Sequence, residues 1–274
     1  MKENKIAVVK VGGDILLDLE QKQGLVRNVK SLIDSGWQVV VIHGGGPQVS
    51  QLQKQLGISI NKIDGRRVTS THDLRAIKQA IAGEVNVDLV SALLSHGVEA
   101  FGFHGASGSL LTASKRPQLF IPSEGKEVDF GEVGQIEGVN TGLLQHILQA
   151  NVVPVIATLS AGREGEIYNI NADTSATHIA EAISADILFM VTEVGGIYSD
   201  INDKDSLIST INSKKATELI DSNIIRDGMI PKVQEAFRIL DQGVNKVVIL
   251  SSKKQYAFLS VVKGKGQFGT TIKL

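Results

Sequence analysis

The chain of 274 residues contains no cysteine, and this absence excludes three classes of protein at once. Without thiols there is no disulfide scaffold, no cysteine-ligated zinc and no thiolate nucleophile. An excess of one charge is also lacking, because 28 Lys and Arg oppose 29 Asp and Glu and leave a formal net charge of -1. That balance provides no basic surface for nucleic acid and no polybasic membrane anchor, so we expect neither nucleic acid nor a membrane as a partner.

Long hydrophobic runs are missing as well. No apolar stretch approaches the roughly 18 residues that cross a bilayer. The first residues show neither a signal-peptide core nor an Arg- and Ser-rich transit region. Yet 42% of the residues are hydrophobic, which is too many for a disordered chain. We therefore expect a folded, soluble, cytoplasmic protein.

The chain does contain a regular alternation of two patterns. Short runs rich in Val and Ile are mostly continuous rather than alternating, as in strands covered on both faces. They predict strands at residues 5–11, 38–42, 99–103, 152–157, 186–191 and 246–250. Amphipathic stretches predict helices at residues 23–34, 48–56, 72–94, 143–150, 173–183 and 232–240, and some stop at a glycine, as at Gly36 and Gly97. The alternation predicts an α/β fold with a mainly parallel sheet and helices on both of its faces.

Two segments interrupt this alternation. Residues 107–140 contain Pro117, Pro122 and several glycines, which predict hairpins or a loop excursion. Residues 199–205 are polar and predict a solvated surface loop. The chain has no internal repeat and no flexible linker, so a boundary between lobes falls within compact structure, and we expect it near residue 180.

Glycines follow the first two predicted strands, where ligands collect in open α/β sheets. The first strand ends in Lys10-Val11-Gly12-Gly13, and the second ends in His43-Gly44-Gly45-Gly46-Pro47 before a helix. Glycine lets backbone N–H groups approach a bound anion, and the helix N-terminus adds partial positive charge. One such turn could simply end a strand. Two of them favour a phosphate site, because Lys10 lies in a buried run and needs a counter-charge.

Familiar nucleotide and catalytic signatures are absent. There is no Gly-x-x-x-x-Gly-Lys-Ser/Thr loop, and the Gly-x-Gly-x-x-Gly at residues 264–269 leaves no room for the helix that should follow it. The six histidines lack metal-ligand spacing, and no Gly-x-Ser-x-Gly elbow is present. We interpret His43 as a hydrogen-bonded residue at a strand end rather than as a general base.

Three further segments have unusual polar patterns. Gly65-Arg66-Arg67-Val68-Thr69 places two guanidinium groups in a turn, where one could hold a carboxylate or both could be solvated. Asn169-Ile170-Asn171-Ala172-Asp173-Thr174 opens a helix, and Asp173 could be its N-cap, although that does not explain the repeated asparagine. Gly228-Met229-Ile230-Pro231-Lys232 puts a cation in the first turn of a helix, which is unfavourable unless an anion lies nearby.

Together these segments resemble the amino acid kinase family. With Val133-Gly134 and Val139-Asn140, they occur in the family's order and span nearly the whole chain. The resemblance implies a three-layer α/β/α sandwich. Residues 1–180 would form an acyl-amino-acid-binding and dimerisation lobe, and residues 181–274 an ATP-binding lobe, on one continuous sheet.

The pattern is most similar to the branch of the family that acts on N-acetyl-L-glutamate. That branch moves the γ-phosphoryl group of MgATP to the side-chain carboxylate in arginine biosynthesis, so the resemblance implies ATP and Mg²⁺ as cofactors. A glutamate-type carboxylate, with a pKa of about 4.3, is ionised at neutral pH and needs no general base. Its approach to a phosphoryl group requires positive charge instead.

The resemblance also implies roles for single residues. Lys10 and Lys232 would stabilise the phosphoryl group in transit, and Asp173 would hold the two lysines in place. Arg67, rather than Arg66, occupies the family's Gly-x-Arg-Val-Thr position and would bind the substrate α-carboxylate. The remaining implied contacts are to substrate (Gly44, Gly45, Asn169 and Asn171) and to nucleotide (Gly12, Gly13, Thr192, Glu193 and again Lys232). No metal ligand is predicted in the protein itself.

Two departures from the family pattern leave alternatives open. Residues 102–108 replace the usual Gly-Leu-Ser-Gly and Asp-Gly turn, which bears on the acyl group or on regulation. Thr192-Glu193-Val194-Gly195-Gly196 replaces Thr-Asp-Val-x-Gly, which bears on the nucleotide contacts near Glu193. A kinase of N-succinylglutamate or of an N-blocked aminoadipate would share most of the pattern, and a non-catalytic sensor could keep the fold. Arginine-inhibited members carry an extra N-terminal helix that links dimers, whereas the first strand is predicted here from residue 5. We therefore expect a homodimer without arginine feedback.

Overall fold

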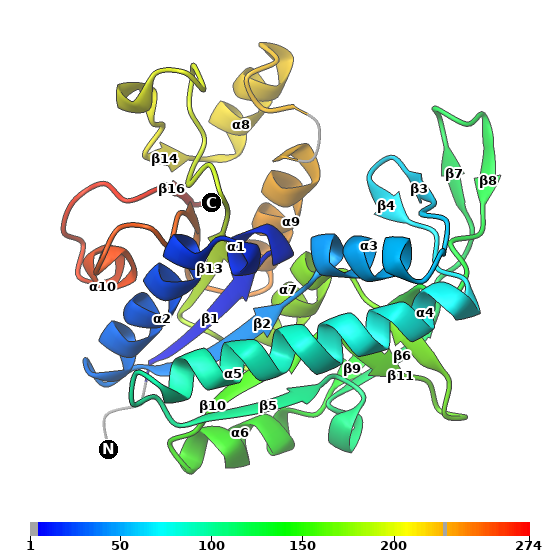
Figure 1. The fold of residues 1–274 in the computed structure, drawn as a ribbon. Coiled ribbons are helices and arrows are strands. Elements are labelled where there is room, and N and C mark those ends of the chain that lie inside the picture. The colour runs from blue at the N-terminus through cyan, green and yellow to red at the C-terminus, as the bar shows by residue number, and fades with distance from the viewer. Residues whose placement is uncertain (1–4, 227–228) are drawn as a thin grey trace.

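An eight-stranded sheet forms the centre of the computed structural model, which describes residues 5–226 and 229–274 (Figure 1). Neighbouring strands are parallel except β15 and β16. Each of the six predicted strands is present within one residue of its expected bounds, so the α/β prediction is confirmed. The spatial order is β14 (Thr210–Ile211), β16 (Thr270–Ile272), β15 (Val247–Leu250), β13 (Ile187–Val191), β1 (Ile6–Val11), β2 (Gln38–His43), β10 (Val153–Ala157) and β5 (Ala100–His104).

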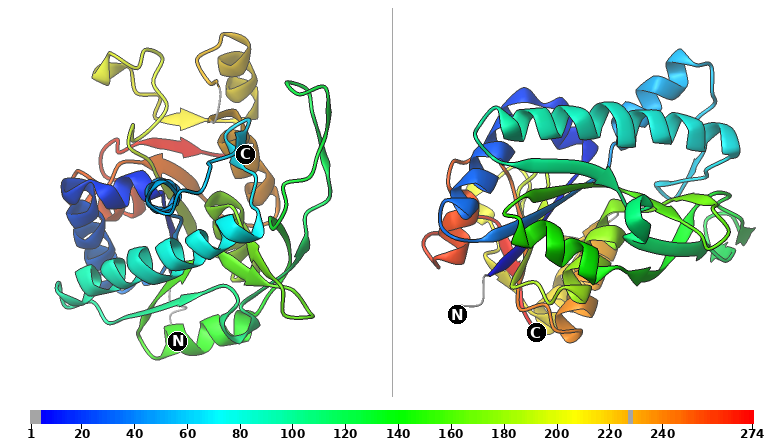
Figure 2. Two further views of the ribbon diagram at one scale, coloured as in Figure 1. Left: turned by 45° about the vertical axis from the view of Figure 1, so that its right-hand side comes forward. Right: turned by 90° about the horizontal axis from the view of Figure 1, so that it is seen from below.

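Helices cover both faces of this sheet (Figure 1, Figure 2). Because an apolar cluster lies between the sheet and each helical layer, the expected three-layer sandwich is confirmed. No helix among the described residues combines the length and the apolar character that a bilayer crossing needs. One layer consists of α1 (Gly13–Leu17), α2 (Leu19–Ile33), α5 (Asn86–Leu94) and α10 (Ala257–Val262), and the other of α6 (Thr141–Gln149), α7 (Ala172–Ala182), α8 (Ser213–Asp221) and α9 (Met229–Asp241).

The alternation of side chains along β1 decides which layer each residue faces. Ala7, Val9 and Val11 belong to the apolar cluster on the side of α2 and α10. Val8 belongs to the cluster on the side of α7 and α9. Lys10 comes two residues after Val8, so it faces the layer of α7. A charged residue is therefore compatible with this buried strand, because it points toward a helix that begins at the same edge.

The predicted helix at residues 72–94 is one rod in three parts. It consists of α4 (Thr71–Ile77), a π-helical segment η1 (Lys78–Val85) and α5, and it is continuous in Figure 1. Ser70 begins the rod with a capping box in which Asp73 is the reciprocal partner. The π-helical middle was not predicted, because its apolar residues also fit an ordinary amphipathic helix.

Residues 107–140 form hairpins, as predicted. After a short 3-10 turn, η2 (Ser107–Ser109), strands β6 (Leu111–Lys115) and β9 (Gly134–Val139) join β11 (Leu159–Ala161) and β12 (Ile167–Asn169) in a second sheet. Strands β7 (Leu119–Ile121) and β8 (Lys126–Val128) form a second hairpin, which shares an apolar cluster with the hairpin of β3 (Lys62–Ile63) and β4 (Arg66–Arg67) (Figure 1). Residues 199–205 are exposed, as predicted, and overlap the 3-10 turn η3 (Lys204–Ser206).

The carboxyl ends of the central strands meet at one edge of the sheet. Val11 of β1 pairs with His43 of β2 and with Val191 of β13, and His43 also pairs with Ala157 of β10. The two glycine turns therefore leave the sheet side by side, one entering α1 and the other entering α3 (Gly46–Gln55). Ligands of open α/β sheets bind at this edge, which makes it the first place to look for a site.

Candidate active site

Lys10, Asp173 and Lys232 lie in contact at this edge, although they come from β1, α7 and α9. Lys10 Nζ is 2.7 Å from Asp173 Oδ1, an ion-pair contact, and Lys232 Nζ donates a hydrogen bond of 2.5 Å to Asp173 Oδ2. Their side chains are 9%, 18% and 26% exposed, in that order, so the three charges are largely withdrawn from water yet reachable. The structure thus brings together the three residues predicted to be catalytic.

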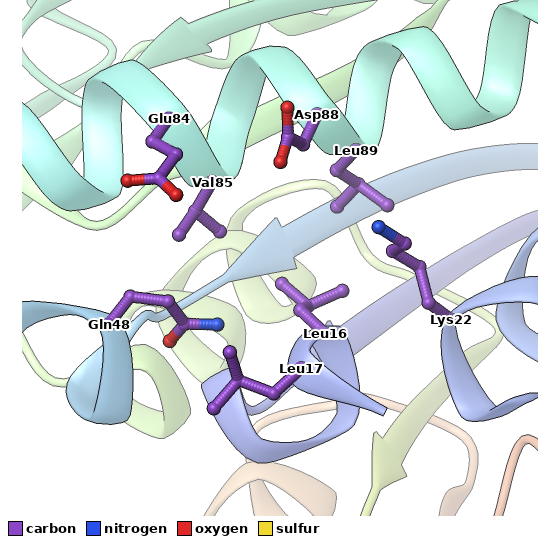
Figure 3. A pocket seen from close by; sticks show the side chains of 8 residues that line it. All are labelled: Leu16, Leu17, Lys22, Gln48, Glu84, Val85, Asp88 and Leu89. Carbon is purple, nitrogen blue, oxygen red and sulfur yellow. The ribbon is translucent and has the colours of Figure 1, made fainter. Parts of the chain in front are cut away.

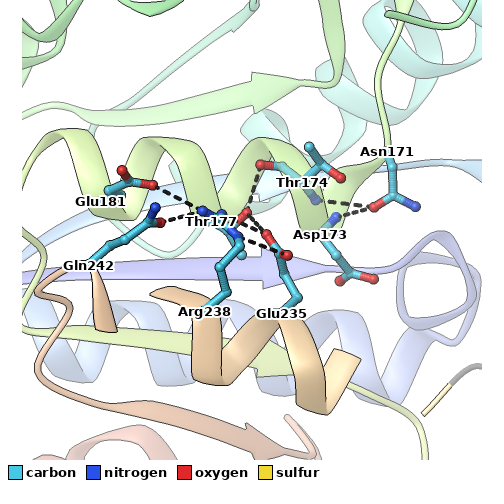
Figure 4. A network of polar contacts seen from close by, with 8 residues as sticks. All are labelled: Asn171, Asp173, Thr174, Thr177, Glu181, Glu235, Arg238 and Gln242. Atoms are coloured by element: carbon cyan, nitrogen blue, oxygen red, sulfur yellow. Dashed lines mark hydrogen bonds and ion pairs between the residues drawn. The ribbon is translucent and has the colours of Figure 1, made fainter. Parts of the chain in front are cut away.

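The first turn of α7 directs Asp173 toward the lysines. The N-cap of this helix is Asn171, whose Oδ1 accepts hydrogen bonds from the backbone N–H groups of Asp173 at 2.7 Å and Thr174 at 3.2 Å (Figure 4). The interpretation of Asp173 as the N-cap is therefore wrong, because Asn171 already satisfies those N–H groups. The Asp173 carboxylate remains available to the two ammonium groups, and a negative charge in the first turn also suits the helix dipole.

The triad of Lys10, Asp173 and Lys232 carries one positive charge in excess. Burial alone would raise the pKa of Asp173, but the charges of Lys10 and Lys232 lower it to about 2. Asp173 is therefore ionised at neutral pH and compensates one of two ammonium groups. The other is a cation held in a partly buried place, which suits an anionic ligand.

The two glycine turns pack against each other beside the triad. A Cβ on Gly13 would stand 2.9 Å from the Cα of Gly45 and 2.5 Å from Gln48 Oε1, so this position excludes a side chain. Gln48 is buried, and its Nε2 donates a hydrogen bond of 2.9 Å to the carbonyl oxygen of Gly13. Gln48 was not predicted as a site residue, although it is a polar residue on the buried face of α3.

The second turn also touches the start of α7. A Cβ on Gly44 would lie 3.4 Å from the Cβ of Ala172, the neighbour of Asp173. On the first turn, a Cβ on Gly12 would meet nothing within 4 Å. The space beside Gly12 leaves room for a ligand to approach the backbone, and the lysine triad lies at the same edge.

Arg67 lies against the second glycine turn and α3. Its Nη2 donates hydrogen bonds to Ser50 Oγ at 2.8 Å and to the Gly46 carbonyl at 3.2 Å, and its Nη1 donates to the buried Gln53. Gln53 donates in turn to Asp73 of the capping box. Burial lowers the pKa of the Arg67 guanidinium, and the charge of Asp73 opposes this change. This half-buried side chain is thus held in one orientation, and two of its partners, Ser50 and Gln53, were not predicted from the sequence.

Asn169 connects its own segment to Thr69 and to Glu132, the residue that precedes Val133-Gly134. Its Nδ2 donates a hydrogen bond of 3.2 Å to Thr69 Oγ1, and its backbone N–H donates to the carbonyl of Glu132 at 2.9 Å. The backbone N–H of Glu132 donates to the carbonyl of Thr69 at 2.7 Å. These hydrogen bonds connect the segment that contains Arg67 to the segment that contains Asn169 and Asn171. All three are predicted substrate residues.

Thr192 and Glu193 follow β13 at the same edge. The Thr192 hydroxyl accepts a hydrogen bond of 3.1 Å from the backbone N–H of Gly195 and closes a turn, while Glu193 is exposed. Within the described residues neither side chain forms a hydrogen bond or ion pair with the triad. Of the predicted segment at residues 228–232, Gly228 lies outside the described residues.

His43 is a buried residue at a strand end, as interpreted from the sequence. Its Nδ1 lies 3.0 Å from the Gly44 carbonyl, and its Nε2 lies 2.8 Å from Nδ2 of Asn86. Burial lowers the pKa of His43 to about 4, although the contact with Gly44 opposes this effect. The ring is neutral at pH 7, so the two contacts assign the Nδ1–H tautomer, which donates to Gly44 and accepts from Asn86.

Gln48 also lines a small pocket, which lies between α1, α2 and the rod that contains α5 (Figure 3). Its volume of about 60 Å³ is far below that of the sites that hold nucleotides or acylated amino acids. The edge with the triad is therefore the better candidate for the active site. The pocket is lined by Leu16, Leu17, Lys22, Gln48, Glu84, Val85, Asp88 and Leu89.

The donors at the edge suit phosphate oxygens. Two ammonium groups and the glycine turns offer N–H donors, whereas among the described residues no three His, Asp or Glu side chains gather closely enough to hold a metal ion. Mg²⁺ usually binds through phosphate oxygens and water, with few protein ligands. An ion carried by nucleotide phosphates is therefore compatible with these residues.

Paired ammonium groups beside glycine turns, at the carboxyl edge of a parallel sheet, define an anion-binding α/β protein. The model of the amino acid kinase family matches residues 5–251. The chain belongs to this family, as the resemblance implied.

Curated relatives extend the similarity over nearly the full length. The chain is 38% identical over 269 residues to an acetylglutamate kinase of Anaeromyxobacter sp. (strain Fw109-5), covering 98% of this chain and 99% of the relative. It is 35% identical over 274 residues to an acetylglutamate kinase of Methanocella arvoryzae, covering 99% and 91%. A crystal structure from Streptococcus mutans UA159 matches with a TM-score of 0.76 and 28% identity over 98% of both chains.

Proposed function

We propose that this chain transfers the γ-phosphoryl group of ATP to the side-chain carboxylate of N-acetyl-L-glutamate, which is the reaction of an acetylglutamate kinase in arginine biosynthesis. The observation that carries the proposal is the pairing of Lys10 and Lys232 on the carboxylate of Asp173. The relatives that bear this name, aligned over nearly their whole length, support the choice of substrate. We also propose a cytoplasmic location.

The acceptor needs no general base. A glutamate side chain is ionised at neutral pH and attacks the γ-phosphorus as it stands. His43, the histidine nearest to the glycine turns in the chain, is buried and occupied by Gly44 and Asn86, so it is not available for proton transfer. The oxygen–phosphorus bond to the acceptor forms as the bond to the leaving ADP oxygen breaks, and no proton is transferred.

The chemical difficulty is the repulsion between two anions, and the triad addresses it. Lys10 and Lys232 would contact the transferring phosphoryl oxygens, while Asp173 keeps the two ammonium groups at one place before the substrates arrive. The backbone N–H groups of Gly12, Gly13, Gly44 and Gly45 would donate to phosphate and acceptor oxygens. Mg²⁺ bound to the nucleotide phosphates would withdraw further negative charge.

The acceptor would lie on the side of Arg67. Its guanidinium, fixed by Gln53 and Ser50, has donors suited to the α-carboxylate of an acylated amino acid. Asn169 and Asn171 would hold the acyl group through their amides; Oδ1 of Asn171 is used in capping α7, so its Nδ2 is the donor assigned to the substrate.

The acceptor and ATP would bind to two different lobes of the protein. Four neighbouring strands of the sheet, β1, β2, β10 and β5, come from residues 1–180, and the other four come from residues 181–274. This clean division supports an acyl-amino-acid-binding and dimerisation lobe at residues 1–180 and an ATP-binding lobe at residues 181–274. Thr192 and Glu193, which begin the loop after β13, would then contact the nucleotide.

The proposal includes a homodimer. Strand β5 is an edge of the central sheet, and exposed apolar side chains flank it on both faces: Phe101 on the strand, Val87 and Leu94 on α5. An uncovered edge strand with apolar flanks suits pairing with a second copy of the same chain.

A substrate panel tests the proposed function. The purified protein is incubated with MgATP and with N-acetyl-L-glutamate, N-succinyl-L-glutamate or N-acetyl-aminoadipate, and ADP formation is followed. We expect the highest kcat/KM with N-acetyl-L-glutamate, and hydroxylamine should trap one hydroxamate for each ADP formed.

The alternatives give different results. A higher kcat/KM with the succinyl or aminoadipate compound would assign the chain to another acylated acidic amino acid. Binding of N-acetyl-L-glutamate without ADP formation would identify a non-catalytic sensor, and ADP without hydroxamate would exclude an acyl phosphate product.

A further inference from the structure

Helices α7 and α9 carry two members of the triad, and polar side chains join the two helices beyond it (Figure 4). On α7 the residues that take part are Asp173, Thr177 and Glu181, spaced four apart. On α9 they are Lys232, Glu235 and Arg238, spaced three apart. Both spacings place the side chains along one face of a helix. The contact between Asp173 and Lys232 is therefore the first step of a ladder of three.

The second step is a hydrogen bond to a buried hydroxyl. Thr177 is fully buried, and its Oγ1 donates to Glu235 Oε1 at 2.8 Å. The same hydroxyl is 2.9 Å from the carbonyl of Thr174, one turn back in α7. Hydrogen bonds to ionised groups are the stronger ones, so this contact restrains the position of Glu235.

The third step holds the Glu235 carboxylate from the other side. Arg238 donates to Glu235 Oε2 through Nε at 3.1 Å and to Oε1 through Nη2 at 2.8 Å, a two-point contact. Its Nη1 lies 3.6 Å from Glu181 Oε2 on α7. Burial alone would raise the pKa of Glu235, but the hydrogen bonds from Arg238 and Thr177 lower it, so the carboxylate is charged at neutral pH.

Helices α7 and α9 also share an apolar cluster, which includes Ala176 and Ile179 of α7 and Val233, Ala236 and Ile239 of α9. The polar ladder adds directional contacts to this non-directional packing. Glu235 is one turn after Lys232, so its anchoring sets the direction in which Lys232 leaves the helix. A lysine side chain is long and flexible, and without that restraint its ammonium group samples many positions away from Asp173.

We propose that Thr177 and Glu235 are positioning residues for phosphoryl transfer: the Thr177 hydroxyl, acting on a Glu235 carboxylate oriented by Arg238, fixes α9 against α7 and so holds Lys232 on Asp173. The proposal rests on the proposed function. It predicts that the ladder governs the chemical step rather than the affinity for either substrate, because neither Thr177 nor Glu235 belongs to the substrate or nucleotide contacts assigned above.

The test replaces the hydroxyl with a methyl group of nearly the same size. Thr177→Val should lower kcat roughly 10- to 100-fold, since small displacements of a catalytic group have effects of that order, while KM for ATP and for N-acetyl-L-glutamate changes less than about threefold. Thr177→Ser keeps the hydroxyl and should restore most of kcat. Glu218→Gln breaks an exposed pair with Lys215 on α8 and is the matched control, expected to leave kcat unchanged.

A double variant asks whether Thr177 acts through Glu235. In a Glu235→Ala background, Thr177→Val should lower kcat by less than about twofold, because the contact is already lost. An undiminished loss in that background, a loss shared by Thr177→Ser, or a rise in KM with kcat retained would each overturn the positioning role.

Hydrogen exchange supplies a measurement that needs no turnover. In the substrate-free protein, the backbone amides of residues 232–235 should exchange faster in Thr177→Val than in the wild type or in Thr177→Ser, and unchanged exchange would overturn the proposal. If the wild type fails to phosphorylate N-acetyl-L-glutamate, the proposed function fails, and the exchange result alone still decides whether the ladder positions α9.

Discussion

Lys232 offers the clearest single-residue test of the proposed chemistry. Lys232→Ala removes one of the two ammonium groups on Asp173 and leaves Lys10 fully compensated by that carboxylate. We expect kcat to fall at least about 100-fold, because the excess positive charge at the phosphoryl group is lost. KM should rise far less. Steady-state kinetics of the variant check this, with Lys215→Ala on α8 as the control, and an unchanged kcat in a folded variant would contradict the role.

His43 should make stability depend on pH. Its pKa is about 4 in the folded protein and near the ordinary histidine value of 6.5 in the unfolded chain, so between these values the unfolded state alone binds a proton. The stabilisation is complete above pH 6.5 and is lost progressively as the pH falls to about 4. The loss amounts to roughly 3 kcal/mol of the free energy of unfolding.

Denaturant unfolding at several pH values measures this contribution. His43→Gln cannot titrate, so its free energy of unfolding should fall less between pH 6.5 and 4 than that of the wild type. His96→Gln is the control, because His96 is exposed at the end of α5 and should leave the pH dependence intact. If the free energy of unfolding falls equally with pH in the wild type and in His43→Gln, His43 is not the source of the pH dependence.

Single residues also show where sequence reasoning succeeds. A lysine inside a buried strand requires a counter-charge, so an anionic partner for Lys10 could be predicted from its place in an apolar run. The family pattern selected Arg67 over its neighbour Arg66, and in the structure Arg67 is half-buried against α3 whereas Arg66 is exposed. That Asp173 compensates both lysines could not be derived from spacing, because the contact depends on how α7 and α9 pack.

Positioning residues were missed for the same reason. Thr177 looks like an ordinary helix-interior residue, and Glu235 and Arg238 look like a surface pair three residues apart, which is common on exposed helices. Their connection exists only between helices. Gln48 and Gln53 were more visible, since a polar residue on the apolar face of a short helix requires a partner.

Among the elements, continuous apolar runs were the reliable signal. They located six strands of the central sheet, because a strand buried on both faces leaves little choice of residue. The five residues of α1 and the six of α10 are too short for a helical period to appear. Helix α8 should have been predicted, since Asn212 caps it and Ala216 and Leu219 recur at helical spacing.

The paired hairpins form an element whose role can be tested. Phe130 is buried in the apolar cluster they share, and its carbonyl accepts a hydrogen bond of 2.9 Å from Thr69 N–H, which ties the cluster to Asn169. Phe130→Ala should therefore raise KM for N-acetyl-L-glutamate about tenfold while KM for ATP stays constant, at a stability cost of about 3 kcal/mol. Kinetics against each substrate measure the split. Phe120→Ala, at an exposed position of β7, should change neither constant, and a rise in both would place the effect elsewhere.

For the whole molecule, the order of the strands was beyond sequence reasoning from apolar runs alone. The runs show that strands exist and do not specify their neighbours. The first strand of the chain lies in the middle of the sheet, between β2 and β13. This arrangement brings residues 1–180 and 181–274 together along one strand pair, and the family resemblance, rather than periodicity, implied one continuous sheet across that boundary.

The open edge of this sheet leads to the prediction for the assembly. Phe101 is 53% exposed on edge strand β5 and stacks on Phe103 at 5.2 Å between ring centroids, so an apolar surface continues from the core to the edge. If a second copy covers it, Phe101→Glu places a charge in the interface and should shift sedimentation from a dimer to a monomer at micromolar concentration. Phe120 is 63% exposed at the hairpin, away from this edge, so Phe120→Glu should sediment as the wild type does. A wild-type monomer, or a dimer that survives Phe101→Glu unchanged, would show that a second copy does not cover this edge.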